Sequence, residues 1–219
     1  MTDFPLPSGI PTSLTIPEMR LLQRYAHEAG RVLEIGTYYG YSAIGMALAG
    51  ADVTSVDPHK PDLSAAMDTK SPYEDTWEPF LANCDRCAVP VVWPAGVLDW
   101  ERLTLPRMYI QGGMGSVIAI REPIESVDLA TESFGLVFID GDHSHPAPMR
   151  DARIALAHLR PPGYVAFHDV TPIWMDVWLT VKELERTGEL VKVAQERYLA
   201  VYQVRASSVS GRSSTPQQA

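Results

Sequence analysis

Four acidic residues lie where short apolar segments end, and two histidines accompany the last two. The acids are Glu34 in "RVLEIG", Asp57 in "ADVTSVD", Asp140 in "FGLVFID" and Asp169 in "YVAFHD". In an open parallel sheet, ligands bind beyond the carboxyl ends of the strands. Burying an unpaired carboxylate is costly, so four acids at predicted strand ends indicate a binding site rather than a contribution to stability.

The first of these segments runs into the turn "EIGTYYG", which has the pattern E-x-G-x-x-x-G. It lacks the closely spaced glycines that bring backbone amides against a pyrophosphate. Such a turn suits a ligand without phosphates that passes close to Gly36. Asp57 follows about 20 residues later, where an acid can accept from both hydroxyls of a ribose. An acidic pocket for a nucleoside without phosphates points to S-adenosylmethionine, whose sulfonium and ammonium groups are cationic.

Several motifs in order carry a family resemblance. "VLEIGTYYGYSAIGMA" resembles the first motif of class I S-adenosylmethionine-dependent methyltransferases, the catechol O-methyltransferases in particular. "FGLVFIDGDHSH", "RPPG" and "YVAFHDV" resemble later motifs of the macrocin and mycinamicin O-methyltransferase type.

The resemblance implies a role for each matching residue. The cofactor-binding residues would be Glu34, Gly36, Tyr38, Gly40, Ser42, Asp57, Glu122 and Asp140. The ligands of a divalent metal, usually magnesium, would be Asp140, His168 and Asp169, and His143 would be the general base.

His168 departs from the family pattern, because the relatives carry an acid or an Asn at that position. Imidazole is softer than the oxygen ligands that magnesium favours, so the identity and even the presence of the metal stay open at this stage. An alcohol or phenol would attack the activated methyl group in line, and a nearby metal would lower the pKa of its hydroxyl. His143, with a pKa near neutrality, could take the proton.

The spacing of segments predicts the elements that position these residues. "TIPEMRLLQRYAHEAG" predicts a helix that begins with a capping box of Thr15 and Glu18 and stops at Gly30. A strand, a helix and a strand follow as a right-handed parallel unit, and "PPG" is expected to stop the helix of "PAPMRDARIALAHLR". We predict an α/β fold: a doubly wound, mainly parallel seven-stranded sheet with an antiparallel last strand, the Rossmann-like methyltransferase fold.

One domain is expected over residues 1–205, with a lid or insertion at 59–116 and a disordered polar tail at 206–219. Cys84 and Cys87 form a lone "CDRC", which predicts two unremarkable thiols on a helix. His27, His59 and His158 are expected at the surface. Trp174, Trp178 and Leu179 form a stripe at helical spacing, which predicts core packing.

The composition disfavours some classes of binding partner. The 219 residues are 46% hydrophobic and carry a formal net charge of −9, which disfavours nucleic acid and anionic membranes as partners. No run approaches the ~18 apolar residues of a membrane span, and the first residues lack a signal-peptide pattern. We expect a cytoplasmic protein that acts on a small hydroxylated molecule, and a homo-oligomer is compatible with this reading.

The leading hypothesis is a metal-assisted, S-adenosylmethionine-dependent O-methyltransferase acting on a sugar, phenol or natural product. Two alternatives stay open. One is a cofactor-binding partner of the cephalosporin-hydroxylase-associated type that transfers no methyl group. The other is an oxidase whose iron is held by Asp140, His143, His168 and Asp169.

Overall fold

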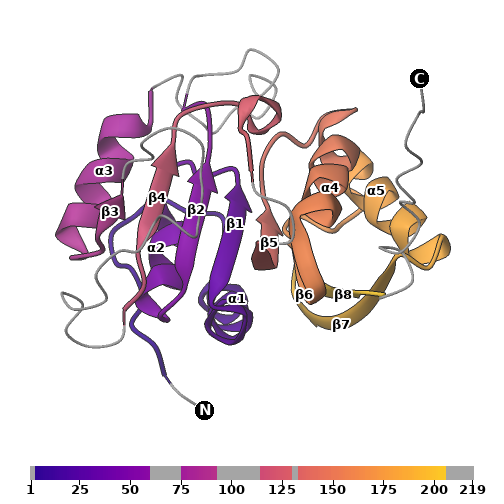
Figure 1. Cartoon of the computed structure of the whole chain (residues 1–219), viewed down its shortest axis with the longest axis horizontal. Helices are drawn as coiled ribbons and strands as arrows, with labels where there is room; N and C mark the ends of the chain where they lie inside the picture. Colours follow the sequence, from indigo (N-terminus) through magenta and orange to yellow (C-terminus); the bar gives the residue numbers. More distant parts are fainter. Residues whose placement is uncertain (1–2, 60–74, 93–113, 130–132, 206–219) are drawn as a thin grey trace, which may run out of the picture.

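The computed structural model describes residues 3–59, 75–92, 114–129 and 133–205. Within them lies one sheet of eight strands in the order β3-β4-β2-β1-β5-β6-β8-β7 (Figure 1). The strands are β1 (Arg31–Ile35), β2 (Asp52–Val56), β3 (Val91–Val92), β4 (Val117–Ile120), β5 (Phe134–Ile139), β6 (Leu159–Phe167), β7 (Leu190–Glu196) and β8 (Leu199–Val204). The predicted tail and the part of the predicted lid at 60–74 and 93–113 lie outside the described residues.

Parallel pairing joins β3, β4, β2, β1, β5 and β6. The last strand, β8, runs antiparallel to both of its neighbours, β6 and β7. The predicted doubly wound sheet with an antiparallel last strand is therefore confirmed. The described sheet has one strand more than the seven expected, because the two residues of β3 pair with the outer edge of β4.

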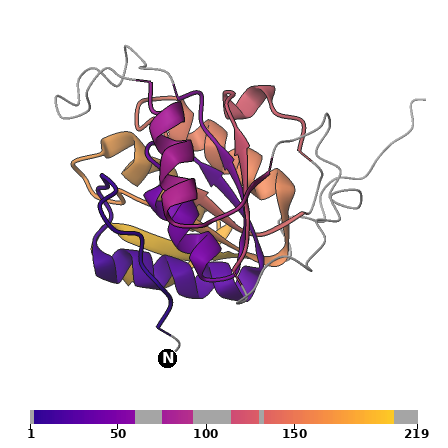
Figure 2. The same ribbon diagram turned by 90° about the vertical axis from the view of Figure 1, so that its left-hand side faces the viewer.

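Helices cover both faces of the sheet. They are α1 (Ile16–Ala29), α2 (Tyr41–Leu48), α3 (Trp77–Arg86), α4 (Ala147–His158) and α5 (Met175–Arg186), with a 3₁₀ turn η3 (Ile124–Ser126). Neighbouring strand residues point to opposite faces: Val32 packs with buried residues of α1, α2 and α3, whereas Leu33 packs with those of α4 and α5. Figure 2 shows the molecule from the side on which α3 lies.

The start of α1 follows the predicted capping box. Thr15 is the N-cap residue, its hydroxyl accepts from the backbone N–H of Glu18, and the Glu18 side chain accepts from the backbone N–H of Thr15. The helix ends at Ala29, and Gly30 follows with a φ of 71°. This end matches the predicted stop.

Two local expectations were wrong. The "PPG" segment does not stop α4, because the helix already ends at His158 and Pro161–Gly163 lie inside β6. The stripe on α5 is not core: Leu179 is 49% exposed, and Trp174 and Trp178 are only half-buried. The buried face of α5 is instead formed by Val177, Val181 and Leu184.

Candidate active site

The carboxyl ends of four parallel strands meet at one edge of the sheet. Backbone hydrogen bonds continue the strand pairing past the strand ends, from Gly36 N to Val56 O (3.0 Å), from Asp140 N to Ile35 O (2.9 Å) and from His168 N to Ile139 O (3.1 Å). Consequently the residues that follow β1, β2, β5 and β6 stand side by side, as the sequence predicted.

Gly36 and Gly40 have structural reasons to be glycine. Their φ angles are 94° and 86°, in the region that other residues rarely adopt. A Cβ at Gly36 would lie 2.3 Å from the carbonyl oxygen of Asp140, and one at Gly40 would lie 2.4 Å from the Phe80 ring. The turn after β1 therefore packs directly on the loop after β5.

Glu34 lies at the centre of a buried hydroxyl network below this turn. Its side chain is 0% exposed and accepts a hydrogen bond from the Ser55 hydroxyl, which in turn contacts the Thr37 hydroxyl. Burial raises the pKa of Glu34 to about 7, and the hydroxyls of Ser42 and Ser55 offset only part of this effect. The second carboxylate oxygen, Oε1, is buried and has no hydrogen-bond partner among the described residues.

Asp57 anchors the turn through backbone amides. Its Oδ2 accepts from Thr37 N (2.7 Å) and Tyr38 N (3.0 Å), and its Oδ1 accepts from His59 N (2.6 Å). Tyr38 has a φ of 52° and its side chain is 37% exposed. Each carboxylate oxygen can accept more than one hydrogen bond, so these contacts are compatible with the predicted ribose role.

His59 was expected at the surface, and this was wrong. It is 2% exposed, stacks on Phe80 with ring centroids 5.3 Å apart, and its Nδ1 lies 2.9 Å from the Thr76 hydroxyl. The Trp77 ring also contacts His59, edge-on, with ring centroids 5.0 Å apart. Thus α3, from the predicted insertion, packs against the residues that follow β2.

The segment after β4 was expected to contribute Glu122. Arg121 forms an ion pair with Asp75 and lies over the Trp77 ring, with its guanidinium carbon 5.7 Å from the ring centroid. Glu122 itself is exposed, and its assignment to the cofactor stays a prediction.

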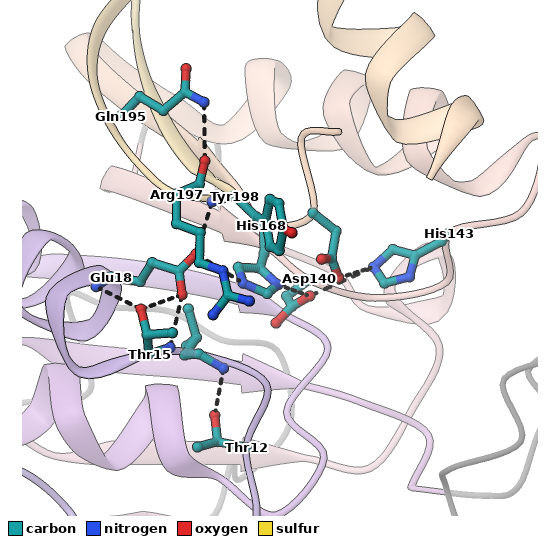
Figure 3. Close-up of polar contacts among 11 residues, drawn as sticks. Thr12, Thr15, Glu18, Asp140, His143, His168, Gln195, Arg197 and Tyr198 are labelled. Atoms are coloured by element: carbon teal, nitrogen blue, oxygen red, sulfur yellow. Dashed lines mark hydrogen bonds and ion pairs between the residues drawn. The ribbon is translucent and has the colours of Figure 1, made fainter. Parts of the chain in front are cut away.

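Asp140, His143 and Asp169 form a compact cluster whose ligand atoms lie within 4.8 Å of one another. His143 Nε2 lies 3.6 Å from Asp140 Oδ1 and 3.6 Å from Asp169 Oδ2 (Figure 3). Burial lowers the pKa of His143, but the two carboxylates outweigh burial and raise it. His143 Nε2 is buried and has no hydrogen-bond partner with good geometry within the described chain.

His168 contacts the same two carboxylates from the interior. Its Nδ1 lies 3.3 Å from Asp140 Oδ1 and 3.2 Å from Asp169 Oδ2, and its side chain is 1% exposed. Burial lowers the pKa of His168, but these carboxylates more than reverse that and raise it to about 11. The imidazolium in turn holds the pKa of Asp140 well below its usual range, against the effect of burial.

An aromatic side chain contacts this cluster, and its neighbours in the chain are exposed apolar residues. The Trp174 and His143 rings have centroids 4.5 Å apart. Ile173 and Met175, on either side of Trp174, are 77% and 50% exposed. The site therefore combines a polar cluster with an exposed apolar margin.

Sequence reasoning brought together most of the residues that the structure places at this edge. It missed Thr37 and Ser55, which link Glu34 to the turn, and Glu18, which reaches His168 from α1. Ser55 carried a detectable signal, because a hydroxyl inside the buried strand β2 needs a partner. Glu18 carried none beyond its capping role.

The strand order, the helices on both faces and the acids at the strand ends define a Rossmann-like methyltransferase fold. A family model described as "Methyltransferase domain" matches residues 33–170. The chain belongs to this methyltransferase family, and the predicted class of S-adenosylmethionine-dependent methyltransferases is confirmed. A search of the curated proteins finds no match to this chain.

Three solved structures illustrate the shared fold. The O-methyltransferase from Bacillus cereus in complex with S-adenosylhomocysteine has a TM-score of 0.58 and 15% identity, covering 90% of this chain and 86% of that one. TomG from Streptomyces achromogenes, an O-methyltransferase involved in tomaymycin synthesis and bound to S-adenosylmethionine, has a TM-score of 0.54 and 16% identity, covering 88% and 81%. A Podospora anserina methyltransferase bound to S-adenosylhomocysteine has a TM-score of 0.56 and 15% identity, covering 88% and 79%. At these identities the likeness concerns the fold.

The helices within the described residues are all too short or too polar to cross a membrane.

Proposed function

We propose that this methyltransferase transfers the methyl group of S-adenosylmethionine to a hydroxyl oxygen of a small molecule, with the help of a divalent cation. One observation carries the proposal: Asp140 belongs to both halves of the site. Its backbone packs on the cofactor turn at Gly36, and its carboxylate faces His143 in the cluster with Asp169. A group held by the turn and a hydroxyl held at the cluster would be neighbours.

On the cofactor side, Glu34 and Asp57 would face the positive groups and the ribose, with Tyr38, Gly40 and Ser42 completing the turn. The unpartnered Oε1 of Glu34 suits an ammonium donor, since a buried acceptor without a partner is costly. S-adenosylmethionine supplies an electrophilic methyl group. The protein's part in such a transfer is mainly to position the two reactants.

On the acceptor side, Asp140 and Asp169 would hold the cation and His143 would take the proton from the acceptor hydroxyl. The two carboxylates fit this assignment, because one oxygen of each lies within 4.8 Å of the other and of the His143 nitrogen, and that nitrogen has no hydrogen-bond partner among the described residues and so can receive the proton. Carboxylate oxygens are ligands that magnesium and manganese favour. A bound divalent cation would lower the pKa of the acceptor hydroxyl.

The apolar margin at Ile173, Trp174 and Met175 favours an acceptor with an apolar body next to its hydroxyl. The net charge of −9 disfavours a nucleic-acid acceptor. The cytoplasmic location and a homo-oligomeric state remain predictions from the sequence.

Calorimetry with S-adenosylhomocysteine tests the cofactor half of the proposal. Asp57→Ala removes the turn anchor and the ribose acceptor together, so binding should be lost, whereas Asp85→Ala on the exposed surface of α3 should bind as the wild type does. Unchanged affinity in Asp57→Ala would refute the cofactor assignment.

The acceptor half of the proposal is tested by removing the cation. EDTA should abolish methyl transfer, and added magnesium or manganese should restore it. Activity that resists EDTA would refute the role of the cation.

A further inference from the structure

Glu18 is a buried carboxylate with a fixed orientation. It lies in the first turn of α1 and is 0% exposed. Its Oε2 accepts from Thr15 N (2.8 Å) and from the Thr15 hydroxyl (2.6 Å), and its Oε1 accepts from Tyr198 N (2.9 Å) (Figure 3). Both oxygens therefore have partners, so the carboxylate cannot rotate without breaking a hydrogen bond.

The same Oε1 also faces the active site. It lies 3.6 Å from Nε2 of His168, whose other ring nitrogen contacts Asp140 Oδ1 at 3.3 Å and Asp169 Oδ2 at 3.2 Å. One imidazole ring thus lies within ion-pair distance of a carboxylate on α1 and of the two carboxylates at the ends of β5 and β6, while neither ring nitrogen has a hydrogen bond of good geometry among the described residues.

The two histidines of the site approach Asp140 from different sides. Figure 3 shows His168 on the side of Glu18 and His143 on the other side. The side chain of His168 is 1% exposed, whereas that of His143 is 22% exposed. The inner side of the carboxylates is thus closed by His168, and a ligand from solvent reaches them from the side of His143.

A second link runs from Glu18 to Asp169 through the turn between β7 and β8. Tyr198 donates its backbone N–H to Glu18, and its carbonyl accepts from Val170 N at 3.0 Å. Asp169 has a φ of 55°, which is unfavourable for a residue other than glycine and persists only when the surroundings enforce it. The hydrogen bonds of His168 N to Ile139 O (3.1 Å) and of Val170 N to Tyr198 O hold the backbone on both sides of Asp169.

We propose that Glu18 is a positioning residue of the active site. Through the His168 ring and the Tyr198 turn, it fixes the carboxylates of Asp140 and Asp169 in the arrangement that receives the cation. In this proposal His168 holds the two carboxylates from the protein interior and is not itself a metal ligand. This differs from its sequence-based assignment as a ligand. The proposal rests on the proposed function only where it names a cation.

The helix cap alone does not require a glutamate at this position, since Glu and Gln serve equally in a capping box. A carboxylate, however, accepts at both oxygens, whereas an amide presents a donor at one end. Glu18→Gln can keep the contact with Thr15 and would then turn its amino group toward Tyr198 N and His168. Thr15→Ala is the matched control, because it removes a cap partner and leaves the carboxylate in place.

The first test is proton NMR of the imidazole N–H groups in the ligand-free chain, with the His168 signals assigned by their loss in His168→Asn. We expect slowly exchanging N–H signals for both ring nitrogens. Glu18→Gln should shift or abolish the Nε2–H signal, while Thr15→Ala leaves it in place. Should Glu18→Gln fail to fold, Glu18→Asp, which withdraws the carboxylate by one methylene, takes its place.

The second test is the affinity for Mn²⁺, measured by electron paramagnetic resonance. Loss of an outer partner of a metal ligand typically weakens binding by about 10-fold or more, and we expect this for Glu18→Gln but not for Thr15→Ala. The double variant with His168→Asn should lose less affinity than the sum of the two single losses, because Glu18 acts in part through that ring.

Unchanged ring signals and unchanged Mn²⁺ affinity in Glu18→Gln would overturn the proposal, and so would equal losses in Glu18→Gln and Thr15→Ala. If the wild type binds no Mn²⁺, the cation of the proposed function is refuted. The ring signals then still decide whether Glu18 positions His168.

Discussion

The Cα of Gly36 packs against the backbone of Asp140, so closely that a Cβ would lie 2.3 Å from the Asp140 carbonyl oxygen. This contact joins the turn after β1, which carries residues of the proposed cofactor site, to the loop after β5, which carries Asp140 and His143 of the proposed catalytic cluster. The glycine that first suggested a ligand close to the backbone is required by the protein's own packing. Its conformation therefore couples the two halves of the site.

Gly36→Ala tests this coupling. The new methyl group meets backbone atoms that cannot move aside, and φ is 94°, so we expect a loss of about 2 kcal/mol or more in the free energy of unfolding and loss of cofactor binding. The control is Gly30→Ala, where φ is also positive at 71° but nothing lies within 4 Å of the new Cβ. Its cost should be only the backbone strain, about 1 kcal/mol. Equal costs in urea denaturation would contradict the packing argument.

Glu34 predicts a pH dependence of cofactor binding. Its pKa in the free protein is about 7, and a cationic ligand prefers the ionised carboxylate. The affinity for S-adenosylmethionine should therefore rise about 10-fold between pH 6 and pH 8. Calorimetry of Glu34→Gln should show weaker binding without this slope. A wild-type affinity that stays flat over the same range would argue against contact between Glu34 and the cofactor.

His143 should affect turnover rather than cofactor binding. Loss of a general base typically lowers the rate 10²–10⁴-fold, so His143→Gln should reduce kcat by about that factor and leave the dissociation constant of S-adenosylhomocysteine unchanged. Because the two carboxylates raise the pKa of His143, the wild-type rate should increase with pH at higher pH than an ordinary histidine base would require. The control is His145→Gln, two residues along the chain and exposed. Equal rates for the two variants would remove His143 from the reaction.

The raised pKa of the buried Asp151 carboxyl group predicts that the free energy of unfolding depends on pH. Asp151 is 1% exposed on α4, and burial raises its pKa to about 6 from an ordinary value of 3.8, although Arg150 Nε donates to its Oδ1 at 3.0 Å. The folded state thus binds this proton more tightly than the unfolded state, and stability is lost as the pH rises from about 4 through 6. The full difference between the folded and unfolded pKa values of Asp151 lowers the free energy of unfolding by about 3 kcal/mol at pH 7.

Asp151→Asn should therefore be more stable than the wild type at pH 7, by about 2 kcal/mol after loss of the partly exposed ion pair, and no more stable at pH 4. Urea denaturation at both pH values measures this, with the exposed Asp128→Asn as control. If the free energy of unfolding of Asp151→Asn differs from that of the wild type by the same amount at both pH values, burial of the Asp151 charge is not the cause of the difference.

Features that depend on residues close together in the sequence could be predicted, whereas features that depend on contacts between distant residues could not. The capping box of Thr15 and Glu18, the strand-end acids and the order of elements depend on local pattern, and the structure has them where expected. His59 was misplaced, because its burial depends on contacts with Phe80 and Trp77 of α3, which the sequence around His59 does not reveal. The contact of Glu18 with His168 spans 150 positions of the chain and has no local signature.

For the stripe of Trp174 and Leu179, a local sequence pattern was present but the burial predicted from it was wrong. Helical spacing of apolar residues predicts a buried face, but here it lies beside His143 and partly in solvent. Periodicity reports that two residues share a face of a helix, and it does not report what that face packs against.

The central claim is methyl transfer to oxygen, and mass spectrometry of the reaction products tests it most directly. The wild-type chain, purified without added metal and analysed for its metal content, is incubated with S-adenosylmethionine carrying an isotopically labelled methyl group and a panel of apolar phenols and alcohols, with magnesium or manganese. We predict S-adenosylhomocysteine and a product with the label on oxygen in equal amounts, both lost with EDTA. Absence of S-adenosylhomocysteine with every acceptor, together with tightly bound iron in the purified protein, would contradict the account and favour an oxidase.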